Sequence, residues 1–251
     1  MTRAGVGTET WIPPEGFVRE HGIQGQAKNS RTFSYDVHPC GSLLHYILSG
    51  GVHAFPGKHI ADMERNLRNG KHHPKIVLRQ GRIDKGRCED MLEAVHLIGK
   101  MLEVEPNRRP TMEVVLEHPF FMTPTDKLNV IRRNRDNSWN WCQGKSFCDS
   151  RNPKNDDWRK LKKLKKLLNL KIKQSSYRKQ LPELARFIRN VREHLFDGDG
   201  GTETTTTLAE AMGLSLIGHQ DSVEADAKVV QYFSDAEPSI FIQLLPWSPL
   251  K

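Results

Sequence analysis

Residues 97–121 of the chain read LIGKMLEVEPNRRPTMEVVLEHPFF. An apolar run is interrupted by a turn bounded by Pro106 and Pro110, and a second apolar run ends at His118, Pro119 and Phe120. Because proline fixes the backbone and does not continue a helix, this pattern predicts short helices separated by turns. Similar apolar runs with Gly and Pro between them extend back to residue 10, so residues 10–121 are predicted to form a helical unit.

Two stretches further upstream extend the pattern. Residues 35–57 read YDVHPCGSLLHYILSGGVHAFPG, with Asp36 near the start and Gly41 five residues later. Residues 7–16 read GTETWIPPEG. Residues 7–16 resemble the end of a kinase activation segment, and residues 35–57 resemble the kinase helix that begins Asp-Val-x-x-x-Gly. Residues 97–121 resemble the end of a protein-kinase C-terminal lobe, with its closing His-Pro-Phe.

The kinase resemblance implies structural roles for four residues. It pairs Glu15 with Arg109 in an ion pair that ties the activation segment to the helical lobe. Asp36 precedes an apolar-periodic run and is expected to cap its helix, and Gly41 follows in the same motif. Unpaired surface charges at Glu15 and Arg109 are the alternative.

Phosphoryl transfer needs a Gly-rich loop, a strand lysine, a catalytic-loop Asp and Asn, and a metal-binding Asp-Phe-Gly. The six residues before Gly7 cannot contain them. We therefore expect no kinase activity and no cofactor in this chain, and we expect it to be truncated at its N-terminus. ATP or ADP with Mg would bind only if a longer protein supplied an N-terminal kinase lobe upstream of this chain.

The remainder of the chain is predicted to form a second helical unit. The segment 122–157 is polar and Asn-rich and is expected to be a connector, with residues 158–251 forming the second domain after the partial kinase-like domain at 1–121. The predicted fold class is thus mainly α. The net charge of +8 favours a polyanionic partner.

A motif within the second unit points to chemistry. Residues 176–196 read SYRKQLPELARFIRNVREHLF, in which Leu184, Phe187, Ile188, Val191 and Leu195 recur with helical period. This stretch is similar to the nuclease helix of the inositol-requiring endoribonuclease / ribonuclease L family. The spacer Val-Arg-Glu before the histidine makes the match nearer to ribonuclease L.

The resemblance places four family site residues on this chain: Tyr177, Arg189, Asn190 and His194. Histidine titrates between pH 5 and 8 and suits proton transfer, so His194 is assigned as the general acid. Tyr177 would activate or position the 2′-hydroxyl of RNA, and Arg189 and Asn190 would donate to the scissile phosphate. A surface or capping role for His194 is the alternative.

A basic stretch precedes this motif. Residues 156–173 read DDWRKLKKLKKLLNLKIK, which predicts a helix with one apolar edge and a basic face. RNA contact is predicted for Trp158, by stacking, and for Lys162, Lys163, Lys165 and Lys166. A solvated or protein-binding face for the lysines is the alternative, and core anchoring is favoured over stacking for Trp158.

The chemistry implied by the resemblance is metal-independent cleavage of single-stranded or loop RNA by 2′-OH attack, in a homodimer formed through the kinase-like lobe. No metal site is expected, because the four cysteines show no CxxC spacing. A cytoplasmic location without membrane contact is expected, or the cytosolic face of the endoplasmic reticulum through a missing anchor. The alternative functions are an inactive pseudokinase and nuclease-domain scaffold that binds RNA or protein, and a fragment of a bifunctional kinase and endoribonuclease of the unfolded-protein response.

Overall fold

The computed structural model describes residues 10–17, 33–73, 91–133, 154–170, 177–195, 208–213 and 223–247. These residues are mainly helical and include no β-strand, so the predicted mainly α fold class is confirmed. The chain divides into two compact units, one made of residues 1–120 and 247–251 and the other of residues 121–246. Among the described ranges, no helix is both long and apolar enough to cross a membrane.

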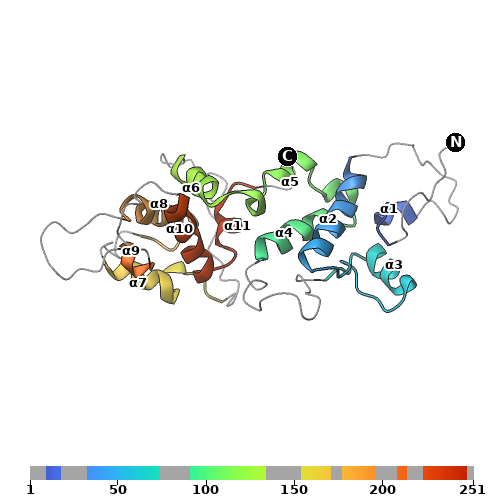
Figure 1. The fold of residues 1–251 in the computed structure, drawn as a ribbon, viewed down its shortest axis with the longest axis horizontal. Coiled ribbons are helices and arrows are strands. Elements are labelled where there is room, and N and C mark those ends of the chain that lie inside the picture. The colour runs from blue at the N-terminus through green and yellow to red at the C-terminus, as the bar shows by residue number, and fades with distance from the viewer. Residues whose placement is uncertain are drawn as a thin grey trace, which may run out of the picture. The chain divides into compact units, whose positions relative to one another are not determined.

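The described residues of the first unit form the helical segments that are coloured blue to green in Figure 1. Helix α2 packs against α4, and the core between the helices includes Val37, Leu97 and Met101. The segments are α1 (Pro14–Phe17), α2 (Ser34–Leu48), α3 (Ile60–Arg68), α4 (Leu92–Met101), the 3-10 turn η1 (Pro106–Arg108) and α5 (Met112–Leu116).

Helix α2 begins earlier than the sequence predicted. Its N-cap is Phe33, and the backbone N–H of Asp36 already donates to the Phe33 carbonyl at 3.1 Å. The prediction that Asp36 caps this helix was therefore wrong: Asp36 lies inside the first turn, where its negative charge still complements the positive end of the helix dipole. The helix ends before Gly50 and Gly51, whose φ angles of +71° and +104° suit glycine.

Gly41 lies where α2 approaches α4 most tightly. A Cβ atom at this position would come within 2.8 Å of the Cβ of Met101 and 3.3 Å of a methyl group of Leu102. The glycine therefore lets the two helices pack closely, which gives a structural reason for the residue that the kinase resemblance singled out.

The second unit is a cluster of helices around α10 (Val223–Ala236), which contacts four of its neighbours. The 3-10 turn η2 (Pro119–Phe121) leads into it. The neighbours of α10 are α6 (Pro124–Arg133), α7 (Lys162–Leu170), α8 (Leu181–Glu193) and α11 (Ile240–Leu244); the 3-10 turn η3 (Trp158–Lys160) and α9 (Leu208–Ala211) pack on α7.

Helix α6 lies within the segment 122–157 that was expected to connect the units. Its Leu128 and Ile131 are buried in the core of the second unit, so this part of the segment contributes to that core. The rest of the expected connector up to residue 153, which includes Trp139 and Trp141, lies outside the described residues. The domain limits at 121 and 158 stay a prediction.

Arg109 links three segments of the first unit. Its buried guanidinium donates to both carboxylate oxygens of Glu15, at 2.7 and 2.8 Å, so the predicted ion pair is present and bidentate. The same group donates to the carbonyls of Ser34, Glu103 and Val104 at 2.7 to 2.9 Å. All five N–H donors of the guanidinium are thereby used.

His38 on α2 is fully buried and stacks on Phe55, with ring planes 9° apart. Neither of its ring nitrogens has a hydrogen-bond partner. Burial, together with the positive charges of Arg109 and His72, lowers the pKa of His38 from 6.5 to about 3. The imidazole is therefore neutral in the folded protein at ordinary pH.

Replacing Arg109 with lysine is expected to lower the free energy of unfolding by roughly 3 kcal/mol, because a lysine cannot reproduce the planar five-donor arrangement and leaves buried acceptors without partners. Urea denaturation measures the change. The matched control is Arg65→Lys, since Arg65 pairs with Asp62 on the exposed face of α3 and should change stability by less than about 0.5 kcal/mol. Similar effects of the two substitutions would contradict the role of Arg109.

Acidification is expected to destabilise the protein through His38. Between pH 6.5 and 3 the unfolded chain binds a proton that the folded chain does not, so the free energy of unfolding falls as the pH falls below about 6.5. The contribution of His38 amounts to about 2 kcal/mol between pH 7 and pH 5. His38→Phe keeps a stacked ring without the titration.

Urea denaturation at both pH values should therefore show a smaller loss of stability for His38→Phe than for the parent chain. The substitution His59→Phe, at an exposed histidine before α3, is the control and should leave the pH dependence unchanged. An unchanged pH dependence in His38→Phe would show that His38 does not carry this effect.

Candidate active site

Helix α8 supports the candidate site. It begins at Leu181 with Pro182 in its first turn, and the apolar stripe predicted from the sequence is buried throughout. Arg192 of this helix also forms a buried ion pair with Asp226 of α10. The periodic apolar residues and this pair fix the rotation of α8 in the second unit.

Three aromatic rings meet at the base of the site. Phe187 stacks on Trp158 with ring centroids 5.2 Å apart and meets Tyr177 edge to face at 5.3 Å. On another side it contacts Phe233 of α10 at 5.9 Å. Such contacts hold the ring positions more specifically than apolar burial alone.

The structure brings Tyr177 and Asn190 together. The Asn190 Nδ2 atom donates to the Tyr177 hydroxyl oxygen at 2.7 Å. The Tyr177 side chain is buried, with 3% of the residue exposed, and the guanidinium of Arg186 lies over its ring at 4.9 Å. A buried phenol held in this way can orient the Asn190 amide. Contact of Tyr177 with the 2′-hydroxyl of RNA stays a prediction.

Arg189 adjoins this pair. Its Nη2 atom lies 3.4 Å from the Oδ1 atom of Asn190, a long hydrogen bond, and its buried Nε atom has no hydrogen-bond partner among the described residues. Arg189 as a whole is partly exposed, and a partly exposed guanidinium suits the binding of an anion.

His194 lies at the end of α8 rather than within it. The helix ends at Glu193, and His194 is its C-cap, with its backbone N–H donating to the Asn190 carbonyl at 2.9 Å. The chain leaves helical geometry at His194, so this residue lies directly after the last helical residue. The side chain is exposed one turn beyond Asn190, where a ligand can reach it. The glycines expected to end the helix, Gly198 and Gly200, lie outside the described residues.

Trp158 is part of the core. Its side chain is fully buried between Phe187 and Tyr177, so it cannot stack on an RNA base in this structure. The RNA-binding assignment of Trp158 is therefore corrected in favour of the core position, because its ring fills the space beneath α8.

The four predicted RNA-binding lysines differ in their surroundings. Lys163 binds Asp235 of α10 at 2.8 Å and lies over the Tyr232 ring at 5.6 Å, so it joins α7 to α10. Lys162, Lys165 and Lys166 are exposed. Their contact with RNA stays a prediction.

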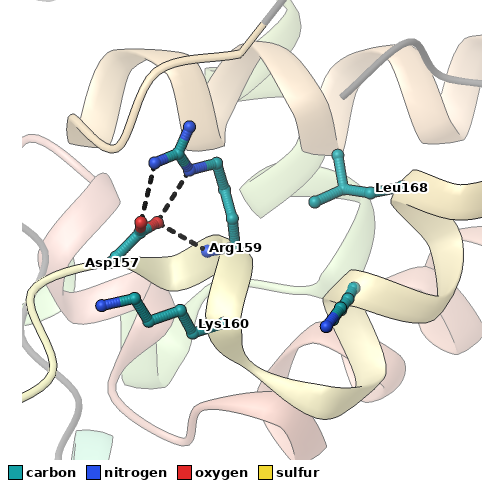
Figure 2. A pocket seen from close by; sticks show the side chains of 5 residues that line it. Asp157, Arg159, Lys160 and Leu168 are labelled. Atoms are coloured by element: carbon teal, nitrogen blue, oxygen red, sulfur yellow. Dashed lines mark hydrogen bonds and ion pairs between the residues drawn. The ribbon is translucent and has the colours of Figure 1, made fainter. Parts of the chain in front are cut away.

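Sequence reasoning missed a hollow beside η3. It has a volume of about 290 Å³ and is lined by Asp157, Arg159, Lys160, Lys165 and Leu168 (Figure 2). Arg159 donates to both carboxylate oxygens of Asp157, at 2.7 and 2.8 Å, and these hydrogen bonds hold the pKa of Asp157 below its ordinary value. The Asp-x-Arg spacing at 157–159 was the sequence signal, because an N-cap aspartate can bind an arginine two residues on.

Arg159 also connects this hollow to the candidate site, since its Nη1 atom donates to the Tyr177 backbone carbonyl at 3.1 Å.

As to metals, no group of three His, Cys, Asp or Glu residues within the described ranges is arranged to hold one. Cys88, Cys142 and Cys148 lie outside those ranges.

Sequence comparison finds relatives for about half of the chain. It is 32% identical over 132 residues to the serine/threonine-protein kinase/endoribonuclease IRE1 of Oryza sativa subsp. japonica, and 32% identical over 134 residues to the sensor for unfolded proteins in the ER ire1 of Schizosaccharomyces pombe. The human serine/threonine-protein kinase/endoribonuclease IRE2 is 29% identical over 126 residues. Half of this chain is homologous to the IRE1 kinase/endoribonucleases.

These matches cover 50 to 53% of the chain and 12% of each IRE1 or IRE2 relative, so the chain spans a small part of their length. No protein-family model matches the chain. Among solved structures, the twitchin kinase region of C. elegans matches 45% of this chain and 17% of its own, with 24% identity and a TM-score of 0.32.

The hydrogen bond between Tyr177 and Asn190 can be tested by a double-mutant cycle. We expect Tyr177→Phe and Asn190→Ala each to lower stability by about 1 kcal/mol, and the double variant to lose about 1 kcal/mol less than their sum. Urea denaturation measures all four proteins. The matched cycle pairs Asn190→Ala with Tyr232→Phe, whose hydroxyl binds the Lys163 carbonyl and should give additive effects. Additivity in both cycles would contradict the bond.

Proposed function

We propose that this protein is an endoribonuclease that cleaves single-stranded or loop RNA without a metal ion or other cofactor. The observation that carries the proposal is the Tyr177–Asn190 hydrogen bond, which fixes an amide beside Arg189 on a helix that ends at the exposed His194. The IRE1 relatives are named as endoribonucleases, which supports RNA as the substrate.

The proposed reaction is an internal transfer. The 2′-oxygen of RNA attacks the adjacent phosphorus and a 2′,3′-cyclic phosphate forms, while the bond between phosphorus and the 5′-oxygen breaks. His194, in its protonated form, delivers a proton to the leaving 5′-oxygen. The proton of the 2′-hydroxyl passes to solvent.

The other residues bind and orient the substrate. The partly exposed Arg189 would bind the scissile phosphate through its guanidinium, together with the Asn190 amide. Tyr177 is a positioning residue, because its buried hydroxyl accepts the Asn190 hydrogen bond. We assign Lys162, Lys165 and Lys166 to the approach of the RNA backbone, since they are exposed and charged.

We propose that the active form is a homodimer, as the family resemblance implies, and that it works in the cytoplasm or at the cytosolic face of the endoplasmic reticulum. The greater similarity to ribonuclease L stays a prediction that depends on the Val191-Arg192-Glu193 spacer. The names of the relatives also support the alternative of a bifunctional kinase and endoribonuclease of which this chain is a part.

The test is to incubate a fluorescent loop RNA with the purified dimer in EDTA and to measure its cleavage. We expect cleavage to persist in EDTA, to leave a 2′,3′-cyclic phosphate, and to fall by about a hundredfold or more in His194→Ala, because loss of a general acid removes that much rate. Analytical ultracentrifugation confirms the dimer in the assay.

His59→Ala removes an exposed histidine from the other unit and should cut like the parent. Uncut RNA, or cleavage by His194→Ala at the parent rate, would overturn the proposal. Binding of RNA without cleavage would favour the scaffold alternative.

A further inference from the structure

The hollow beside η3 carries more positive charge than its internal contacts neutralise. Of the described residues that line it, Arg159, Lys160 and Lys165 are cationic and Asp157 is anionic, so these four carry two positive charges in excess. No ion pair to Lys160 or Lys165 exists within the described part of the chain, and both side chains are exposed. Such a site attracts an anion from solution.

Arg159 is held in place before any ligand arrives. Asp157 binds its Nε and Nη2 atoms, and the Tyr177 carbonyl accepts from its Nη1 atom. Within the described part of the chain, three of the five guanidinium N–H donors are used in this way, which leaves two. Because the guanidinium is already ordered, a ligand would lose little side-chain entropy in binding it.

The hollow is large enough for an anionic group together with part of the molecule to which that group is attached. A volume of about 290 Å³ exceeds what a phosphate alone needs and lies just below the usual range of small-molecule pockets. Arg159 and Lys160 border the hollow from different sides, with Leu168 supplying an apolar wall (Figure 2). An apolar wall beside cationic groups suits a ribose phosphate.

We propose that this hollow is a phosphate-binding subsite for the RNA strand, in which Arg159, Lys160 and Lys165 hold a phosphodiester next to the one that is cut. The inference rests on the proposed function for the identity of the strand. The connection is the Arg159–Tyr177 hydrogen bond, which ties the subsite to the residue that orients Asn190.

The test compares two double variants of equal charge on the full chain. Lys160→Ala with Lys165→Ala removes the cations of the hollow, and Lys162→Ala with Lys166→Ala removes two exposed cations of α7 outside it. The probe is a single-stranded 2′-O-methyl RNA, which lacks the attacking hydroxyl and is not cut. Fluorescence anisotropy gives its Kd over a series of salt concentrations, and urea denaturation shows that both variants fold.

We expect the first double variant to raise the Kd about tenfold and to make the slope of log K against log salt shallower by about 1.4, which is about 0.7 for each lost phosphate contact to a single strand. The second double variant should raise the Kd about twofold. Equal losses in the two variants, or an unchanged Kd in the first, would overturn the subsite.

Calorimetric titration with inorganic phosphate distinguishes the source of the anion. If phosphate alone binds the parent and not the first variant while RNA affinity is the same in both, the hollow serves a free anion and the RNA assignment is wrong. Because the probe cannot be cut, a failure of the proposed cleavage chemistry would leave this binding result intact.

Discussion

The geometry of the candidate site depends on the contacts of the Phe187 ring. It touches Trp158 and Tyr177 at the base of the site and Phe233 of α10 on the other side. The same helix therefore builds the core with one face and presents Arg189 and Asn190 with another. Because protein interiors are close-packed, the position of Phe187 limits how far Tyr177, and with it the Asn190 amide, can move.

Counting hydrogen-bond donors separates the structural arginine from those suited to binding. Arg109 uses all five N–H donors on Glu15 and three backbone carbonyls, so it has no donor left for a ligand. Within the described residues Arg159 uses three, so two of its donors remain for a ligand. This physical difference, rather than charge alone, supports a binding role for the second unit.

The sequence predicted those features that local pattern encodes. The apolar stripe of α8 and its start near Pro182 followed from helical period and proline geometry, and the Glu15–Arg109 pair followed from a motif. Other features depend on contacts between distant segments. Burial of Trp158 requires Phe187 above it, and the engagement of Lys163 requires Asp235, which lies 72 residues away. The start of α2 was also mispredicted, at Asp36, because the residue that caps a helix depends on where the backbone turns.

Helical geometry explains why the lysines of α7 cannot share one role. Successive residues are rotated by about 100° around an α-helix, so Lys162 and Lys166 lie close together in angle, while Lys163 and Lys165 project to either side of them. The observed contacts agree, since Lys163 binds Asp235 of α10 and Lys165 lines the hollow near Arg159. All four lysines are exposed, but this basic helix divides into one cation paired with Asp235, one cation of the proposed subsite, and the neighbouring cations Lys162 and Lys166. For this reason, two double variants of equal charge on one short basic segment can separate general attraction of RNA from binding at a defined position.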